Sequence, residues 1–102
     1  MSIFMTARYE VQPDAVDQVT AAIVQFVDYI ESAEPGSIMY RAWQNPAKPT
    51  EFVHLFEFAD EAARELHGQS AAVKRFEAVY IPQLVSGPVK FTQFVEVASV
   101  AR

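Results

Sequence analysis

The first segment of the chain with a clear pattern, residues 3–11, alternates between two kinds of position. Its odd-numbered positions are mostly apolar: Ile3, Met5, Ala7, Tyr9 and Val11. Thr6, Arg8 and Glu10 lie between them. Successive side chains of a strand point to opposite faces of a sheet, so this segment is predicted to be a strand with one packed face.

The next segment repeats apolar residues at helical spacing. Pro13 suits a first helical position, and Asp14 suits the positive end of the helix dipole. Apolar residues then recur three and four positions apart, at Val16, Val19, Ile23, Phe26, Val27 and Ile30. This spacing predicts an amphipathic helix. The triplet Glu34-Pro35-Gly36 is expected to end it, because proline disfavours helix in the residue before it and glycine tolerates the turn out.

Two strands and a hairpin are predicted next. Residues 37–44 and 51–58 are rich in aromatic and apolar residues, and the connecting segment 45–50 holds two prolines. Turn chemistry between two strand-like runs indicates an antiparallel hairpin.

Two short helices and a last strand should complete the chain. Asp60 is placed to cap a helix through about Leu66 that Gly68 breaks. Ser70 is placed to cap a second helix, which carries Val73, Phe76, Val79 and Tyr80 and which Pro82 ends. After Gly87 and Pro88, a final strand is expected from Val89 to about Ala98.

The predicted order is therefore βαββαβ, an α+β, ferredoxin-like domain with an antiparallel sheet over residues 1–102. A chain of 102 residues can bury one hydrophobic core. The third strand is apolar on both sides, since Val53 and Leu55 oppose Phe52, His54, Phe56 and Phe58. Helices can cover only one face, so the other is expected to pack against a second copy as a homodimer. The alternative is that scattered surface hydrophobic residues need no partner.

Composition excludes several partners. Eight Lys and Arg against thirteen Asp and Glu give a net charge of −5, which disfavours nucleic acid and anionic membranes. There is no cysteine, no signal-like N-terminus and no run of 18 apolar residues, and we expect a cytoplasmic location. Three glycines form no phosphate-binding or dinucleotide motif, and two histidines form no metal signature. Neither a cofactor nor a metal is expected.

Four pieces of sequence together resemble the antibiotic biosynthesis monooxygenase family. They are Glu34-Pro35-Gly36 followed by Tyr40, the strand 52–58, Asp60-Glu61-Ala62-Ala63 leading to His67, and Ser70 with Phe76. The resemblance implies a dimeric α+β barrel. Members include quinol and anthrone oxygenases that need no cofactor, heme-degrading enzymes and an autoinducer isomerase.

The chain departs from this family at two places. Members usually carry an acidic residue and an aromatic at the end of the third strand, where this chain has Phe56 and Phe58. Glu57 is one residue along and should face the other way. Heme-degrading members use an asparagine, a tryptophan and a ligating histidine, and the matching positions are Ala7, His67 and Glu77. None is kept, so heme breakdown is not expected.

His67 is the first candidate for a catalytic base, because imidazole can take a proton near neutral pH from a phenol or an activated C–H group. The alternative is that His67 caps helix carbonyls or bonds across a loop. His54, central on a strand, is more typical of a core or interface histidine. A pocket for a flat substrate would be lined by Tyr40, Trp43, Phe52, His54, Phe56, Phe76 and Tyr80.

The leading hypothesis is a cofactor-independent monooxygenase acting on a small aromatic quinol-type or polyketide-type compound and dioxygen, as the resemblance implies. A deprotonated polyphenol can pass an electron to dioxygen itself, so the protein need supply only a cavity, a base and a few hydrogen bonds. One alternative is a non-catalytic dimer that binds a small apolar ligand. Another is an isomerase of a small phosphorylated metabolite held by Arg8 and Arg41.

Overall fold

The computed structural model describes residues 2–102. Its elements are β1 (Ile3–Val11), a 3-10 turn (Pro13–Ala15), α1 (Val16–Ala33), β2 (Ser37–Gln44), β3 (Glu51–Phe58), α2 (Glu61–Gly68), α3 (Ala71–Tyr80), a second 3-10 turn (Ile81–Gln83) and β4 (Leu84–Phe94). The predicted βαββαβ order is confirmed, with the second helical region in two pieces.

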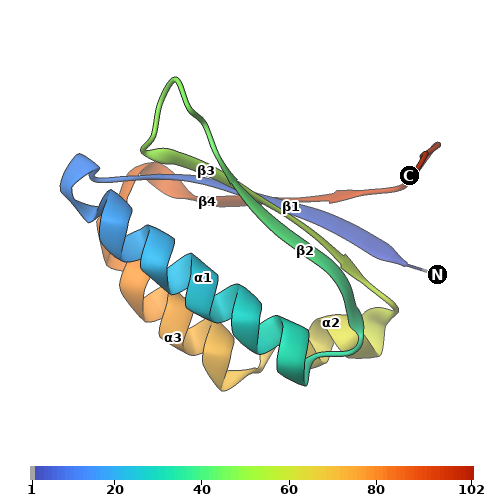
Figure 1. Ribbon diagram of the computed structural model, residues 1–102. Coiled ribbons are helices and arrows are strands. Elements are labelled where there is room, and N and C mark those ends of the chain that lie inside the picture. The colour runs from blue at the N-terminus through green and yellow to red at the C-terminus, as the bar shows by residue number, and fades with distance from the viewer. Residues whose placement is uncertain (1) are drawn as a thin grey trace.

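The four strands form one antiparallel sheet in the order β2-β3-β1-β4. All three helices lie against the same face of this sheet, as Figure 1 shows. This two-layer arrangement is the predicted ferredoxin-like α+β fold. Both predicted helix caps are confirmed, because the Asp60 carboxylate accepts from the Ala63 amide at 2.9 Å and the Ser70 hydroxyl accepts from the Val73 amide at 3.1 Å.

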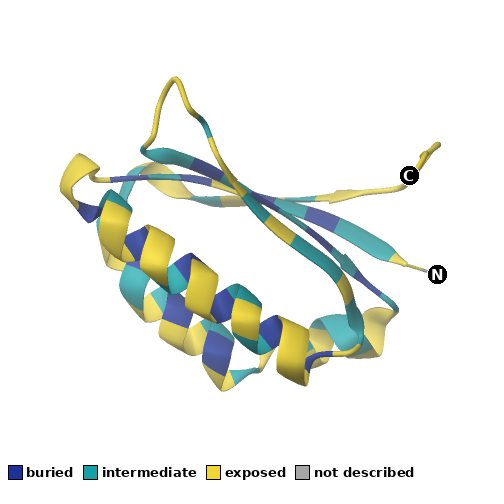
Figure 2. Ribbon diagram, in the orientation of Figure 1, coloured by how far each residue is buried: buried dark blue, intermediate teal, exposed yellow. Residues whose placement is uncertain are grey.

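The core fills the space between the two layers. Met5, Ala7, Tyr9 and Val11 of β1 are buried on the helix side, as their alternation predicts. They meet the predicted apolar stripe of α1, of which Val19, Ile23, Phe26 and Ile30 are buried. In Figure 2 the buried residues follow the inner surfaces of the helices and the strands facing them. On β3, Phe52, His54, Phe56 and Phe58 are all buried.

The last strand differs from its prediction at both ends. It was expected from Val89 to about Ala98, but β4 runs from Leu84 to Phe94. Gly87 and Pro88 lie inside the strand, at an irregularity where the register with β1 shifts and where Ser86 and Gly87 have φ angles of 62° and 100°. A bulge accommodates such residues, and β4 is an edge strand, where a proline need not donate to a ladder. Gly87 and Pro88 were therefore misleading as markers of where the last strand begins.

No helix within residues 2–102 covers the outer face of the sheet (Figure 1). The strand registers place Phe4, Met39, Trp43, Val53, Leu55 and Phe94 on this face. Trp43 and Phe94 are each 53% exposed. Among the helices of residues 2–102, none combines the length and the apolar character needed to cross a bilayer.

Helix α2 approaches the α1–β2 connection very closely at Gly36. A Cβ atom placed on Gly36 would lie 2.6 Å from the Cβ atom of Ala63 in α2. The Gly36 carbonyl also accepts a hydrogen bond of 2.8 Å from the Ala59 amide, just before α2. Glycine at position 36 therefore allows α2 to dock beside the end of α1.

We expect Gly36→Ala to destabilise the fold by about 2 kcal/mol, because the added methyl group overlaps an atom that has no rotamer in which to move aside. The midpoint of urea unfolding measures the loss. Gly68→Ala is the matched control, since a Cβ atom there meets no atom within 4 Å. The explanation requires the Gly36→Ala, Ala63→Gly double variant to be more stable than Gly36→Ala alone. Equal unfolding midpoints for Gly36→Ala and Gly68→Ala would contradict it.

Candidate functional site

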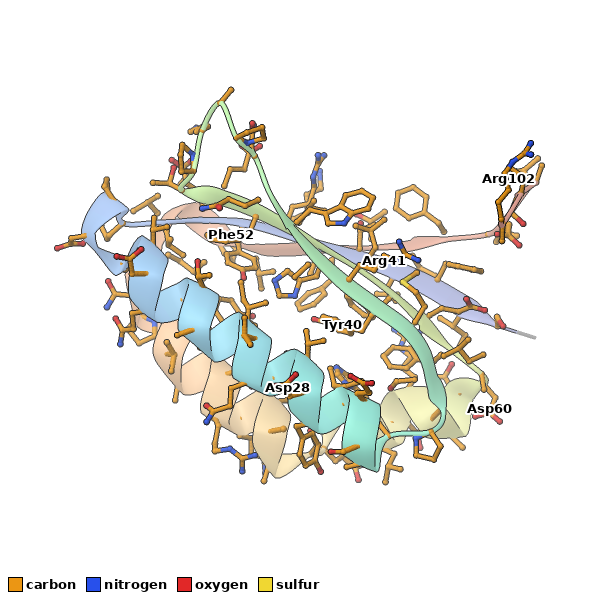
Figure 3. All side chains as sticks on the ribbon, viewed as in Figure 1. Asp28, Tyr40, Arg41, Phe52, Asp60 and Arg102 are labelled. Atoms are coloured by element: carbon orange, nitrogen blue, oxygen red, sulfur yellow. The ribbon has the colours of Figure 1, made fainter. Side chains whose placement is uncertain are left out.

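A cavity of about 410 Å³ lies between the helix side of the sheet and the helices. Its wall is mainly aromatic and aliphatic, and every strand and helix contributes to it. Its polar or charged lining residues are Tyr9, Tyr40, His54, Arg64, His67, Glu77 and Tyr80. In Figure 3 the labelled Tyr40 extends from β2 into the space between the sheet and the helices. The cavity has the size of a site for one small molecule.

His67, which is partly buried, pairs with the buried Glu34 at the α2 side of this cavity. The His67 Nδ1 atom lies 2.7 Å from the Glu34 Oε1 atom, and the two side chains are 12% and 6% exposed. The Ser37 hydroxyl donates to the same Oε1 atom at 2.8 Å. Glu34 follows the last residue of α1, and His67 is in the last turn of α2. The pair therefore links the two helix ends that Gly36 allows to approach.

The hydrogen bond determines which ring nitrogen of His67 can act as a base. An ionised carboxylate only accepts hydrogen bonds, so Nδ1 must carry the proton that it shares with Glu34. Nε2 then holds the lone pair, and within residues 2–102 no hydrogen bond involves this atom. A carboxylate that orients a histidine and stabilises its protonated form is the usual arrangement of a general base.

Aromatic rings surround the His67 imidazole. Its ring centroid lies 5.1 Å from that of Phe58, 5.6 Å from Phe26, 6.0 Å from Tyr40 and 6.2 Å from Phe56. These rings offer flat surfaces on which an aromatic ligand can stack.

A second polar group lies deeper in the sheet. His54, only 1% exposed, is hydrogen-bonded through both ring nitrogens, with the Tyr9 Oη atom 2.8 Å from Nε2 and the Tyr40 Oη atom 2.6 Å from Nδ1. Burial lowers the pKa of His54 to about 4, so the imidazole is neutral at pH 7. Burial likewise raises the pKa of Tyr9 and of Tyr40 well above the usual value, so both remain phenols.

The structure brings six of the eight predicted site residues together around the cavity. They are Tyr40, His54, Phe56, His67, Phe76 and Tyr80. Burial raises the pKa of Tyr80 to about 12, which keeps this phenol neutral as well.

Trp43 and Phe52 do not line the cavity, and their prediction as pocket residues was wrong. Trp43 pairs with Val53 on the outer face. Because Tyr40 and Trp43 are an odd number of residues apart on one strand, they cannot share a face. Phe52 has the right parity but stacks on Tyr9, with ring centroids 5.6 Å apart, and belongs to the core cluster beside the cavity.

Arg8 and Arg41 are also on the outer face, where both are exposed. Neither lines the cavity beside His67, so they cannot hold a phosphate group there. Among residues 2–102, no three His, Cys, Asp or Glu side chains gather as metal ligands would.

The sequence analysis missed several polar residues of the site. It treated Glu34 only as a helix end and Tyr9 only as a strand residue. It did not consider Arg64, and it considered Glu77 only as a position matched to heme-degrading enzymes. Glu34 lies next to Pro35 at a helix end, where carboxylates are normally solvated, and no local pattern indicates its burial. The parity of Tyr9 did carry a signal, since it faces the same side as His54 on the neighbouring strand.

The buried neutral His54 should make stability depend on pH in the acid range. In the folded protein the pKa of His54 is about 4, below the usual 6.5, so the unfolded chain takes up a proton more readily than the folded one. The contribution of neutral His54 to the free energy of unfolding is therefore fully present above about pH 6.5 and is lost as the pH falls toward 4. Between pH 7 and pH 5 this amounts to about 2 kcal/mol of unfolding free energy. Urea unfolding of the native chain and of His54→Gln at both pH values measures it. Equal acid losses in the two proteins would contradict the assignment.

Comparison with solved structures shows the same fold in other organisms. A Bacteroides thetaiotaomicron protein, provisionally named an antibiotic biosynthesis monooxygenase, has a TM-score of 0.89 at 16% identity over 99% of this chain and 94% of its own. Rv0793 from Mycobacterium tuberculosis has a TM-score of 0.85 at 20% identity over 99% and 100%. A Caulobacter crescentus protein with the same provisional name has 0.86 at 20% identity over 95% and 91%.

No curated protein matches the chain by sequence. A family model does match. It is described as antibiotic biosynthesis monooxygenase, and it aligns with residues 2–79, which include β1, α1, β2, β3, α2 and most of α3. The chain therefore belongs to the antibiotic biosynthesis monooxygenase family.

Proposed function

We propose that the cavity is the active site of a monooxygenase that needs no bound cofactor and acts on a small aromatic quinol-type or polyketide-type compound. The observation that carries this proposal is the His67–Glu34 pair, at 2.7 Å, on the wall of an aromatic cavity. Family membership supports the oxygenase chemistry.

In the proposed reaction, His67 Nε2 takes a proton from a substrate C–H or O–H group that the aromatic system makes acidic. The substrate anion gives one electron to dioxygen, and the two radicals join into a peroxide. The peroxide takes the proton back from His67. For an activated methylene, loss of the remaining C–H proton with O–O cleavage then leaves a carbonyl and water, so that R₂CH₂ and O₂ become R₂C=O and H₂O.

Glu34 has two roles in this scheme. Its hydrogen bond fixes the His67 tautomer, and its charge stabilises the imidazolium that forms when the substrate loses its proton. The position of His67 in the last turn of α2 adds to this stabilisation, because the C-terminal end of a helix dipole favours a cation.

Replacing His67 by alanine or glutamine should lower substrate-dependent oxygen uptake about a hundredfold or more, because both variants lack the base. Glu34→Gln should lower it about tenfold, since the amide can still accept from Nδ1 but has no charge. An oxygen electrode with a panel of hydroquinones and anthrones measures the rates. Glu31→Gln, an exposed position on the same helix, is the control.

If the native chain consumes no oxygen above the buffer rate with any of these compounds, the oxygenase proposal fails for them. Binding without uptake would instead support the alternative of a non-catalytic protein for small apolar ligands. That alternative is favoured by Phe56, which is at the position where family members usually carry an acid and which forms part of the cavity wall.

We also propose that two copies pack through the outer faces of their sheets and so form the dimeric barrel. The outer face has large apolar residues on each strand, including Phe4, Trp43, Leu55 and Phe94. Arg8 and Arg41 share this face, but large apolar residues on all four strands of one uncovered sheet face are unusual on a monomer. A twofold axis would bury the same residues in both copies.

Leu55→Asp should raise the dissociation constant of the dimer by about two orders of magnitude or more, because each copy would bring a carboxylate from a central strand into the interface. Sedimentation velocity across a micromolar concentration series measures this. Val24→Asp is the matched control, since Val24 is an apolar residue, 57% exposed, on α1. A native chain that sediments as a monomer at these concentrations would overturn the dimer.

A further inference from the structure

The Tyr9–His54–Tyr40 group is a continuous hydrogen-bonded chain across three strands. His54 on β3 is between Ala7 of β1 and Ala42 of β2 in the two registers. The small alanine side chains leave room beside the imidazole, and Tyr9 and Tyr40 reach it diagonally from two positions away on their strands. The sheet is therefore built to hold these three rings in one arrangement.

The two hydrogen bonds of His54 must run in the same direction, because a neutral imidazole has one donor and one acceptor nitrogen. If Tyr9 donates to Nε2, then Nδ1–H donates to Tyr40, and the hydroxyl hydrogen of Tyr40 is free. In the opposite direction the free hydrogen belongs to Tyr9. Neither hydroxyl makes a second hydrogen bond within residues 2–102. In both cases the Tyr9–His54–Tyr40 group has one unused O–H donor, and it is on a tyrosine that lines the cavity.

Tyr40 is the end of the chain that lies next to the proposed base. Its ring centroid is 6.0 Å from that of His67 and 5.6 Å from that of His54. Its ring also stacks on Phe56, with centroids 5.1 Å apart and planes 13° from parallel. A flat ligand that presents an acidic group to His67 would have the Tyr40 hydroxyl as a neighbouring donor.

We propose that Tyr40 is a substrate-binding residue that donates its hydroxyl hydrogen to the ligand oxygen on which negative charge develops, and that His54 and Tyr9 are positioning residues that hold it in this direction. This rests on the proposed function only in that the ligand binds in the cavity beside His67. The phenols keep their own protons and do not transfer them to the ligand anion, because burial raises the pKa of Tyr9 and of Tyr40. A preorganised neutral donor of this kind favours an anion without a charge of its own.

The test uses 4-nitrophenol as the probe, because its phenolate has an absorbance band distinct from that of the phenol. At one fixed pH, the ratio of bound phenolate to bound phenol is read from the spectrum at saturation. Tyr40→Phe should lower this ratio about tenfold, as expected for loss of one hydrogen bond to a charged oxygen. Tyr29→Phe is the matched control, since Tyr29 is a tyrosine of α1 that does not line this cavity.

Nitrogen-15 spectra of the histidine rings in the native protein give a second measurement that needs no variant. With the phenolate bound, His54 should be protonated at Nδ1 and unprotonated at Nε2. Protonation at Nε2 in the complex would overturn the proposal, because Tyr40 would then donate to His54 and not to the ligand. An unchanged phenolate ratio in Tyr40→Phe, or failure of the native chain to bind the probe, would overturn it as well.

These outcomes are distinct from failure of the proposed function. If Tyr40→Phe lowers the phenolate ratio while no compound supports oxygen uptake, the donor assignment stands and the oxygenase proposal fails. If oxygen uptake depends on His67 but the ratio is the same with and without the Tyr40 hydroxyl, the oxygenase proposal stands and the donor assignment fails.

Discussion

The structure depends on a layer of aromatic rings that joins the helices to one face of the sheet. Phe76 of α3 is at its centre, with ring centroids 4.9 Å from Phe26 of α1 and 5.7 Å from His54 of β3. Tyr80, 4.6 Å from Phe76, extends the layer to Tyr9 of β1. Large rings bury much apolar area each, and their rigid shapes cannot fill every space between two curved layers. The remaining space is the cavity, so the same aromatic residues form the core and the wall of the site.

Polar groups can lie within this layer only where they are paired. An unbonded histidine in such surroundings would cost several kilocalories per mole, whereas His54 has a partner on each nitrogen. Glu34 is only partly satisfied, because its Oε1 atom accepts from His67 and Ser37 while its buried Oε2 atom has no partner within residues 2–102. Incomplete satisfaction of a buried carboxylate is uncommon, and it occurs here beside the candidate base. The two polar groups therefore differ: both ring nitrogens of His54 have partners, whereas the Oε2 atom of Glu34 can accept a hydrogen bond from a further donor.

Alternation and helical spacing were enough to predict most of the fold. The parity of β1 identified its buried face, and the stripe of α1 identified its packed side. Prediction failed where one residue type serves two structures, as with Gly87 and Pro88, which end strands in most proteins but form a bulge in this one. It failed for Trp43 because aromatic character was weighed without its parity. Glu34 and His67 are 33 residues apart, and only the docking of α2 on the end of α1 brings them together.

The position of the carboxylate has a consequence for how the site is assembled. The family resemblance implies an acid at the end of the third strand, but Phe56 is at that position, and the carboxylate that reaches His67 comes from the α1–β2 connection. An acid on a central strand would be held by the ladder on both sides. Glu34 is held by the end of α1 and by the contact of Gly36 with Ala63, the same contact that places α2 and His67. The base and its partner are thus positioned by one helix-docking contact, and changes that loosen α2 should weaken the pair before they disturb the sheet.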